Sequence, residues 1–579
     1  MNLQSLRTLP VFFLATFAVS SCDTKPTGET NEQNFGAEIL PGSPEEAAIL
    51  ELVNTADLEE LDKDAGLNAN AAKAIIAERE LGDFTSLDEL LDVKGVGPKA
   101  LEKLLEHARA KGLIGDTASV EVFFSPLPLD ESHVAEVANL IDNAKNSVDM
   151  AIFSYRSGDI SAAIERAVSN GVEVRVLFQK AGSENKLEGS KLENSTSAKF
   201  EELGADVRFV NRINHHKFII VDGPRSDLAD ARTATVLSGS ANFNAPAANK
   251  FDETTLVIKN SEETAIEFQR EFNLLWKHSR DFAFFDFEFV ESELDLTDIT
   301  FNDDHGLEIF MTSANYNIKE DSTTFRVDRD SMVGADLWVE AIEEADEQIL
   351  ISSGHLRLRP VAEALIAKKA DDPEIDIRVY LDQQEYVSFS TNKKQTDKRE
   401  KCLEDAELLD SESKRERKLF DCLQKSFLWA RDISDAGIEV RFKTYALRWH
   451  HSYAPQMHNK WMVTDGERVV TGSYNLSINA EQNSFENMQS FEGDSYKALA
   501  ELFVDKFETL WATGDGELAN IEERIETEDP VPLVFADTPI ALTTDEVGEL
   551  RKLMRANCPQ AGSEAFRKFP EKNQTCPRN

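Results

Sequence analysis

Two stretches of the sequence follow one pattern, His215-His216-Lys217-Phe218-Ile219-Ile220-Val221-Asp222 and His458-Asn459-Lys460-Trp461-Met462-Val463-Thr464-Asp465. Both have the form H-x-K-x4-D. The apolar residues after each lysine favour a strand, on which a histidine and a lysine two positions apart point the same way. Histidine exchanges a proton near neutral pH, and a lysine beside it can hold a phosphate oxygen. The pattern therefore predicts that each motif places a group that exchanges a proton beside a cation.

Each motif is followed by a second set of polar residues in the same order. Gly239-Ser240-Ala241-Asn242 comes after the first motif, and Gly472-Ser473-Tyr474-Asn475 comes after the second. Glu253 and Glu486 then lie 11 residues beyond the two asparagines. His215 and Asn242 are 27 residues apart, whereas His458 and Asn475 are 17 apart. We expect the ten extra residues to lengthen a hairpin between two strands without moving the polar groups.

The segments around the motifs also repeat, which sets the expected architecture. Each half shows a helix, an apolar strand, a second helix and a second strand before its motif, and ends on a helical stretch near a tryptophan (Trp276 and Trp511). Strands that alternate with helices predict α/β packing with both faces of a sheet covered. The expected fold is two pseudo-symmetric halves, 120–290 and 305–515, each a mixed sheet flanked by helices. A charged, helix-like insertion interrupts the second half at 388–425.

This duplicated set of motifs resembles the phospholipase D superfamily over about Val120 to Gly514. The resemblance implies one active site shared by both halves, in which one histidine attacks phosphorus and forms a phosphohistidine. The other protonates the leaving oxygen and then activates water. We assign His215 as the nucleophile and His458 as the acid, although pseudo-symmetry leaves the reverse assignment open. The resemblance implies that Lys217, Lys460, Asn242 and Asn475 hold the phosphate oxygens with help from Ser240 and Ser473, that Glu253 and Glu486 orient the histidines, and that Asp222 and Asp465 brace the motifs.

No other group of residues in the sequence predicts a cofactor site. No group of histidines, cysteines or carboxylates has metal-ligand spacing, so we expect neither a metal nor another cofactor. His216 alternates away from the cleft, and His450 and His451 belong to a surface loop or to the mouth of the site.

Residues 47–114 are helical in pattern, and Leu90 to Leu101 resembles a helix-hairpin-helix element of the secreted DNA-uptake type. Gly95 and Gly97 permit its tight turn, and Pro98 begins the second helix. In DNA-binding members such a turn holds a phosphate, and Lys94, Lys99 and Lys103 would assist. Against this, 51–111 contains 14 acidic and 8 basic residues, which equally favours a helical spacer or a protein-contact module.

The chain begins with features of an exported protein. Arg7, the apolar run Leu9 to Val19 and the small residues before Cys22 predict a signal peptide over 1–21. Val-Ser-Ser-Cys resembles the lipobox of bacterial lipoproteins, which implies lipidation of Cys22 and a membrane anchor on the periplasmic or cell-surface side. A plain secretory signal is the alternative. Residues 22–46 would be the linker from the anchor.

Four further cysteines are consistent with an oxidising compartment. Proximity in sequence favours Cys402–Cys422 and Cys558–Cys576, although three connectivities and free thiols remain open. Residues 516–579 are expected to form an acidic linker, a helix over Thr544 to Ala556 and a cysteine-bearing tail.

Three functions fit the sequence. The formal net charge of −44 disfavours non-specific binding of polyanions and, with the anchor, favours a phospholipid substrate. An endonuclease supplied with DNA by the helix-hairpin-helix module is the second hypothesis. The third is an anchored, non-catalytic binding protein with a vestigial site. Headgroup preference, hydrolysis versus phosphatidyl transfer, and oligomeric state are not readable from the sequence.

Overall fold

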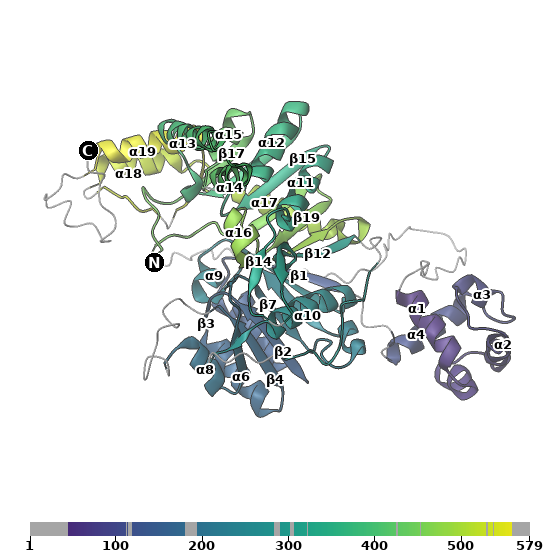
Figure 1. Cartoon of the computed structure of the whole chain (residues 1–579). Helices are drawn as coiled ribbons and strands as arrows, with labels where there is room; N and C mark the ends of the chain where they lie inside the picture. The colour runs from purple at the N-terminus through teal and green to yellow at the C-terminus, as the bar shows by residue number, and fades with distance from the viewer. Residues whose placement is uncertain are drawn as a thin grey trace, which may run out of the picture.

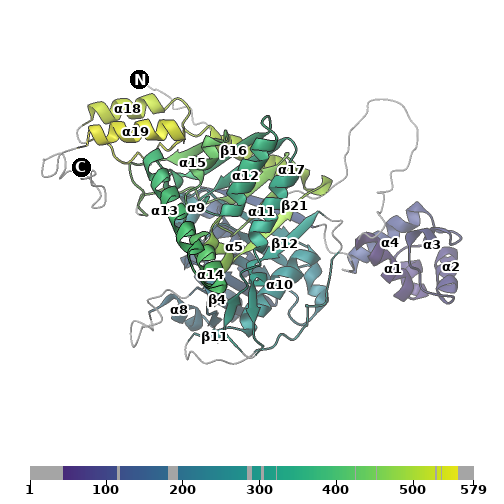
Figure 2. The same ribbon diagram turned by 45° about the horizontal axis from the view of Figure 1, so that its top comes forward.

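The computed structural model describes residues 44–111, 113, 118–179, 194–282, 290–301, 306–320, 322–423, 426–451, 453–528, 531–535 and 538–558. The predicted signal peptide, Cys22, most of the linker and Cys576 lie outside these residues. In the described part, two eight-stranded sheets stand side by side, and a small group of helices lies beside them (Figures 1 and 2). The predicted α/β fold with two related halves and a helical N-terminal module is confirmed.

The two sheets have the same strand order, as the internal repeat predicts. In the first sheet the order is β1 (Ser119–Ser125), β10 (Glu253–Lys259), β8 (Thr235–Gly239), β7 (Lys217–Val221), β2 (Ser147–Ile152), β4 (Glu173–Phe178), β5 (Asp206–Phe209) and β11 (Arg280–Asp281). In the second it is β12 (Leu307–Met311), β21 (Asn487–Phe491), β19 (Arg468–Gly472), β18 (Lys460–Thr464), β15 (Gln348–Ser353), β16 (Asp376–Asp382), β17 (Glu439–Thr444) and β22 (Ile540–Thr543). Three central strands of each sheet run parallel and the others run antiparallel, so both sheets are mixed. Both motif strands, β7 and β18, occupy the same position in their sheets.

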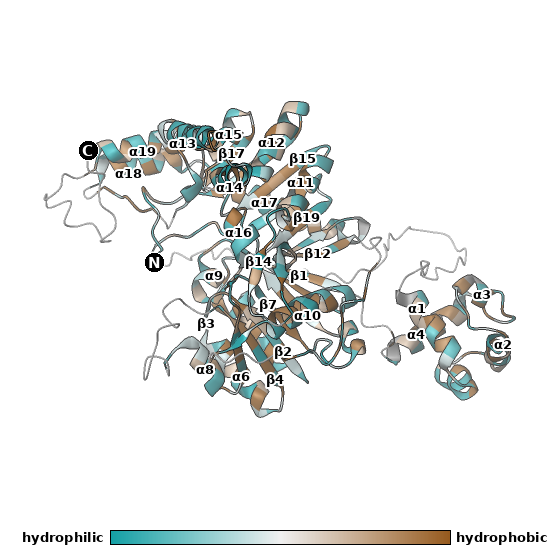
Figure 3. Cartoon of the chain, viewed as in Figure 1, coloured by the Kyte–Doolittle hydropathy of each residue, from teal (hydrophilic) through white to brown (hydrophobic). Residues whose placement is uncertain are grey.

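Helices cover the sheets on both faces. Those of the first half are α5 (His133–Asp142), α6 (Gly158–Ser169), α8 (Thr196–Glu202), α9 (Ala245–Asn249) and α10 (Glu262–Lys277). Those of the second are α11 (Val333–Glu344), α12 (Arg359–Asp371), α13 (Phe389–Glu407), α14 (Glu412–Leu423), α15 (Ala430–Asp435), α16 (Ile478–Asn483) and α17 (Lys497–Trp511), with α18 (Leu518–Thr527) and α19 (Thr544–Ala556) beyond it. The strands are largely apolar in Figure 3, whereas α13 and α14 are mostly hydrophilic.

Two apolar clusters join the halves. One packs Leu256 of β10 against Phe503 of α17 and Trp461 of β18. The other packs Phe272 of α10 and Phe218 of β7 against Phe485 from the second half. Burial of aromatic side chains on both sides of this contact stabilises one fixed arrangement of the two sheets, which a site built from both halves requires.

The region after the second half differs from the expected linker. β22 pairs antiparallel with β17, so the C-terminal segment supplies the eighth strand of the second sheet, where β11 stands in the first. Helix α18 precedes it, and α19 begins and ends at the expected residues with a capping box at Thr543 and Glu546. The prediction of a linker was therefore wrong for Leu518–Thr527 and Ile540–Thr543. A strand of four residues after an acidic stretch gives too little pattern to be recognised.

The insertion 388–425 forms a hairpin of two helices, α13 and α14. The predicted disulfide joins Cys402 to Cys422 across this hairpin, with a Cα–Cα distance of 5.7 Å. Cys558 is also disulfide-bonded. Its predicted partner, Cys576, is outside the described residues, so that pairing stays a prediction.

The N-terminal module consists of α1 (Pro44–Thr55), α2 (Ala69–Arg79), α3 (Leu87–Leu91) and α4 (Pro98–Ala110) around its own apolar core. Pro98 begins α4 as expected, and Gly95 has a φ of +95° that only glycine adopts without strain. Asn68, which replaces a glycine of the first hairpin, caps α2 through a bond from Asn70 N–H. No helix among the described residues is long and apolar enough to span a bilayer.

Candidate active site

The two motif histidines stand where the chain of one half crosses the other. β6 (Ile213–Asn214) pairs in parallel with β20 (Ser484–Phe485), and His215 N–H donates to Phe485 O at 3.0 Å. At the equivalent crossing of the second half over the first, His458 N–H donates to Asp252 O at 2.9 Å. Backbone pairing therefore fixes each histidine against the segment that carries the glutamate of the opposite half.

Each glutamate consequently binds the histidine of the other half. His215 Nδ1 lies 2.7 Å from Glu486 Oε2, and His458 Nδ1 lies 2.8 Å from Glu253 Oε1. Both carboxylates are buried, while the histidine side chains keep 12% and 15% of their surface exposed. A hydrogen bond at Nδ1 leaves Nε2 of each ring for the reaction. The site is incomplete without both halves.

The serines of the two G-S-x-N segments have a different role from the expected one. Ser240 Oγ–H donates to Glu253 Oε2 at 2.6 Å, and Ser473 Oγ–H donates to Glu486 Oε2 at 2.7 Å. Both hydroxyls are buried, and each accepts a backbone N–H from the residue after the glutamate. They hold the glutamates in place, so the expectation that they bind the phosphate oxygens is not supported by their contacts.

The middle residue of each motif ties the halves together once more. Asn459 Oδ1 accepts from Thr254 Oγ1–H at 3.0 Å, while His216 Nδ1 lies 3.1 Å from Asn487 Nδ2. His216 is fully buried, with Nε2 3.0 Å from Glu271, and lies away from the cleft as expected. The same two positions therefore perform the same bridging task in both halves.

The lysines of the motifs are buried beside their histidines. Lys460 Nζ lies 2.8 Å from His458 O and 3.3 Å from His458 Nε2, and Lys217 Nζ donates to His215 O. Burial lowers the pKa of Lys217 to about 7 and that of Lys460 to about 8. An anionic phosphate in the cleft would stabilise the charged form of both lysines.

The two histidine–glutamate pairs differ in their electrostatics. Burial lowers the pKa of His458 to about 4, although Glu253 opposes the shift, and the pKa of Glu253 is below its usual value because His458 and Lys460 outweigh burial. Burial, with the neighbouring lysines, lowers the pKa of His215 well below its usual value. Burial raises the pKa of Glu486 to about 7. The carboxylate beside His458 therefore has a lowered pKa, whereas the carboxylate beside His215 has a raised pKa.

Asn242 and Asn475 each follow a buried serine, Ser240 or Ser473, by two residues. The Oδ1 atom of each is buried and accepts no hydrogen bond among the described residues. Buried amides without partners are rare in proteins, which marks both as groups with a ligand to bind. His133, which begins α5, supports the first of them through a 3.0 Å contact between Nε2 and Asn242 O. Nothing in the sequence around His133 indicated this role.

The glycines that open the two G-S-x-N segments are required by close backbone contacts. A Cβ at Gly239 would stand 2.2 Å from Thr254 O, and one at Gly472 would stand 2.2 Å from Asn487 O. Any side chain here would push apart the strands that carry the serine and the glutamate. These glycines allow β8 and β10, and equally β19 and β21, to approach closely.

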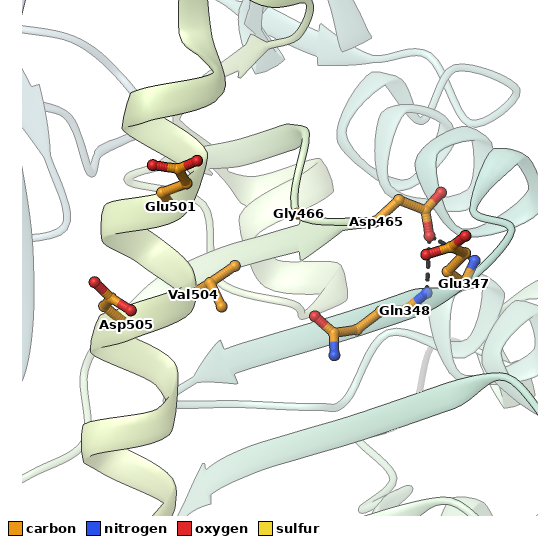
Figure 4. Close-up of a pocket in the computed structure, with 7 residues that line it drawn as sticks. All are labelled: Glu347, Gln348, Asp465, Gly466, Glu501, Val504 and Asp505. Atoms are coloured by element: carbon orange, nitrogen blue, oxygen red, sulfur yellow. Dashed lines mark hydrogen bonds between the residues drawn. The ribbon is translucent and has the colours of Figure 1, made fainter.

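Asp222 and Asp465 stand at the opposite ends of the motif strands from the histidines. Asp222 accepts three backbone N–H groups, from Lys145, Asn146 and Ser147, and Asp465 accepts those of 346–348. Figure 4 shows Asp465 bonded to Gln348 in an acidic pocket that also includes Glu347, Glu501 and Asp505. That pocket lies beyond β18 from His458. Both aspartates brace turns and do not contact the histidines.

A second cavity, of about 450 Å³, lies next to His215. Its walls come from both halves and include Arg212, Ile213 and Asn483. Ile213 is two residues before His215 on the same extended segment, so this cavity leads toward the catalytic edge. Among the described residues, no group of three or more histidines, cysteines or carboxylates has the geometry of a metal site.

The helix-hairpin-helix residues lie in the separate N-terminal module. Lys94, Gly95, Gly97 and Lys99 surround the turn before α4. Lys103 instead donates to Gly66 O at 2.5 Å, so its ammonium group ties α4 to the first hairpin. The expectation that Lys103 assists phosphate binding is not supported by this contact.

Comparisons with known proteins agree with this geometry. The model of the cardiolipin synthase, PLD-like domain family matches 137–276 and 338–511, together more than half of the chain. The helix-hairpin-helix motif model matches 52–109.

The individual relatives match shorter parts of this chain. A phospholipase D of Rickettsia conorii is 31% identical over 22% of this chain and 56% of that protein. The mitochondrial cardiolipin hydrolase of Drosophila melanogaster is 28% identical over 25% of this chain and 59% of its own length. The chain thus spans less than two thirds of these relatives. The solved structure of the phospholipase D family member Nuc of Salmonella typhimurium is 31% identical, covers 28% of this chain and 97% of that chain, and has a TM-score of 0.23.

Proposed function

Because the chain belongs to the family of the cardiolipin synthase, PLD-like domain, we propose that its shared site cleaves the phosphodiester of phospholipids by two displacements at phosphorus. At the level of the family the chain is a phosphodiesterase hydrolase. The observation that carries the proposal is the pair of crossed bonds, His215 to Glu486 and His458 to Glu253, which bring one histidine from each half close enough to interact electrostatically.

In the proposed first step, His215 Nε2 attacks phosphorus and the bond from phosphorus to the leaving oxygen breaks. His458 gives its Nε2 proton to that oxygen. In the second step, water attacks the phosphohistidine, His458 takes a proton from the water, and the P–N bond breaks to release a phosphomonoester. Glu253, whose pKa lies below its usual value, places a negative charge beside His458 and supports its role as the acid.

Lys217, Lys460, Asn242 and Asn475 are placed to hold the phosphate oxygens. The lysines supply charge from the floor of the site, and the side-chain Nδ2–H groups of the two asparagines would donate to the phosphate oxygens. An anionic phosphodiester would raise the pKa of both lysines and of His458, so substrate binding prepares the acid for its proton transfer.

A phospholipid substrate is favoured over nucleic acid by two observations. The curated relatives are named phospholipase D and cardiolipin hydrolase. The net charge of −44 repels a long polyanion, whereas a lipid presents one phosphodiester at a time. The proposed location is the outer side of a bacterial membrane, reached by the signal peptide and lipidated Cys22 expected from the sequence.

The test is turnover of mixed phospholipid vesicles beside single- and double-stranded DNA, with EDTA present. Headgroup release that is lost in both His215→Ala and His458→Ala would support the proposal. Release that persists in either variant, or DNA cleavage without lipid cleavage, would overturn it.

A second experiment identifies the nucleophile. With an aryl phosphodiester, whose leaving group needs no proton, His458→Ala should still give one rapid equivalent of phenolate and a phosphorylated His215. His215→Ala should give neither. The opposite result would exchange the two roles.

Cleavage of DNA is the second candidate, because the chain contains a helix-hairpin-helix motif over 52–109. The turn at Gly95 and Gly97 leaves Lys94 and Lys99 beside the N-terminus of α4, where a phosphate can be held. Loss of DNA cleavage in Lys94→Glu with Lys99→Glu, at unchanged turnover of an aryl phosphodiester, would support this candidate. A parent protein that neither binds nor cleaves DNA at low salt would eliminate it.

A further inference from the structure

Large apolar side chains are rarely exposed in the described residues, and only two of those exposed are aromatic. Phe389 has 67% of its surface exposed and Trp449 has 39%. The other six such side chains are leucines, three of them in the N-terminal module. Exposed aromatic residues that lie together are typical of surfaces that meet another phase or a partner.

Both aromatic residues extend from the edge of the second sheet that carries the acid histidine. Phe389 begins α13, which follows the carboxyl end of β16, and Trp449 lies in the connection after the carboxyl end of β17. β16 and β17 are parallel neighbours, and Tyr445 N–H donates to Gln383 Oε1 where they end. β18 is antiparallel to β15, so His458 precedes β18 at this same edge.

The charge near the aromatic residues is opposite to that of the whole protein. Residues 389–401 contain five lysines and arginines and two acidic residues, and 445–457 contain Arg448 and no acidic residue. Lys393 and Lys394, one turn into α13, are exposed. The far end of the same hairpin, 403–418, contains six acidic and four basic residues. The first turns of α13 therefore carry a net positive charge, and the far end of the hairpin carries a net negative one.

We infer that Phe389, Trp449, Arg448, Lys393 and Lys394, here called the aromatic rim, dock on the surface of an anionic phospholipid bilayer. Tryptophan and phenylalanine insert their rings at the headgroup level, while lysine and arginine attract anionic lipids from within about 10 Å. The inference rests on the proposed function, because docking at this edge would bring the phosphodiester layer to the site of His458.

Docking is measured by sedimentation with vesicles of phosphatidylcholine alone or mixed with phosphatidylglycerol. The chain from residue 24 onward is used, since it keeps every described element and lacks the predicted lipidation site, and His458→Ala prevents lipid turnover. Phe389→Ser with Trp449→Ser should lower the partition coefficient about tenfold or more on both vesicles. Lys393→Gln and Lys394→Gln should each lower it about fivefold on the anionic vesicles alone.

Leu408→Ser is the matched control. Leu408 is 79% exposed and lies 19 residues after Phe389, about 28 Å farther along the hairpin and among acidic residues. Its substitution should leave vesicle binding unchanged. Binding that is equal in the parent and the Phe389→Ser, Trp449→Ser variant, or that falls as much in Leu408→Ser, would overturn the inference.

The docking and the proposed function can fail separately. With His458 intact, the Phe389→Ser, Trp449→Ser variant should hydrolyse a soluble aryl phosphodiester at the parental rate. A parent that binds vesicles through the rim but never releases a headgroup would contradict the proposed substrate and leave the docking established. A loss of aryl phosphodiester turnover in the variant would show that the rim supports the site itself, and would contradict the docking role.

Discussion

The two halves carry the same chemistry but surround it differently. Phe153 and Gly354 hold matching positions, since their N–H groups donate to His216 O at 2.9 Å and Asn459 O at 3.0 Å. The Phe153 ring packs against His215 with centroids 4.6 Å apart, whereas Gly354 places no side chain near His458. The first half therefore packs an aromatic ring against its histidine at this position, and the second half does not.

The segments that lead to the two motifs also differ, in their length and in their packing. In the first half a short segment, 210–214, joins β5 to His215 and forms a wall of the 450 Å³ cavity. In the second, 445–457 is longer, packs Tyr445 and Tyr453 in a cluster of its own, and exposes Trp449. The two halves thus share the crossed hydrogen bonds of the histidines, while the segments around them differ.

The largest expected effect tests whether the halves form one site. His215→Ala and His458→Ala should each lower kcat/KM for a phospholipid roughly 10⁴-fold or more, and the double variant should be no worse than either. Residues that act in one sequence of steps are not additive, because loss of either step already stops turnover. Steady-state assays of the three variants and the parent would measure this. A single variant that keeps about half of the parental rate would instead indicate two independent sites.

Much of this site could be predicted from the sequence, because its residues recur in order around strands with clear patterns. His215, Lys217, Asn242 and Glu253 have counterparts at matching places in the second half, and the fold class follows from the same repeat. The partner of each glutamate could not be predicted. Spacing within a half gives the position of Glu253 along the chain, whereas its bond to His458 depends on how the sheets dock.

Other parts of the site gave no signal at all. His133 supports Asn242 from the start of α5, and Thr312 Oγ1 accepts the backbone N–H of Glu486 at 2.8 Å. Both are single residues on elements with ordinary amphipathic patterns. Their contacts bridge 109 and 174 residues, which no local pattern encodes.

The second prediction tests whether the two histidine–glutamate pairs have different roles. Glu486→Gln should lower turnover of both lipid and an aryl phosphodiester by about 10²-fold, because the amide no longer holds His215 in its nucleophilic tautomer. Glu253→Gln should show a comparable loss on lipid but only a small loss in the initial burst of phenolate from the aryl substrate, because that first step needs no acid. The ratio of the two substrates in each variant measures the difference. Equal ratios would contradict the assignment of nucleophile and acid.

The third prediction concerns a feature in which the halves should behave alike. Gly239→Ala and Gly472→Ala should each lower the free energy of unfolding by ~2 kcal/mol, since the new Cβ meets a backbone carbonyl that cannot move aside. Gly158→Ala is the control, because a Cβ there meets nothing within 4 Å. Thermal unfolding of the three variants beside the parent tests it. Clearly unequal losses at Gly239 and Gly472 would show that the halves differ even in this contact.

The smallest expected effect is a pH profile that separates the two carboxylates. Glu486, with a pKa of about 7, must be ionised to accept from His215, so activity falls as the pH drops through 7. Lys217 and Lys460, with pKa values of about 7 and 8, must be charged to bind phosphate, so activity falls as the pH rises through 7 to 8. The profile of kcat/KM for an aryl phosphodiester should therefore be a narrow bell near neutral pH, with about a tenfold change per pH unit on its limbs.

Glu486→Gln should remove the acidic limb and Glu253→Gln should keep it, because the pKa of Glu253 lies below its usual value and this carboxylate stays ionised throughout the range. A profile that is flat between pH 5 and about 9, or an acidic limb that survives Glu486→Gln, would show that the half of the site around His215 does not carry the titrating carboxylate.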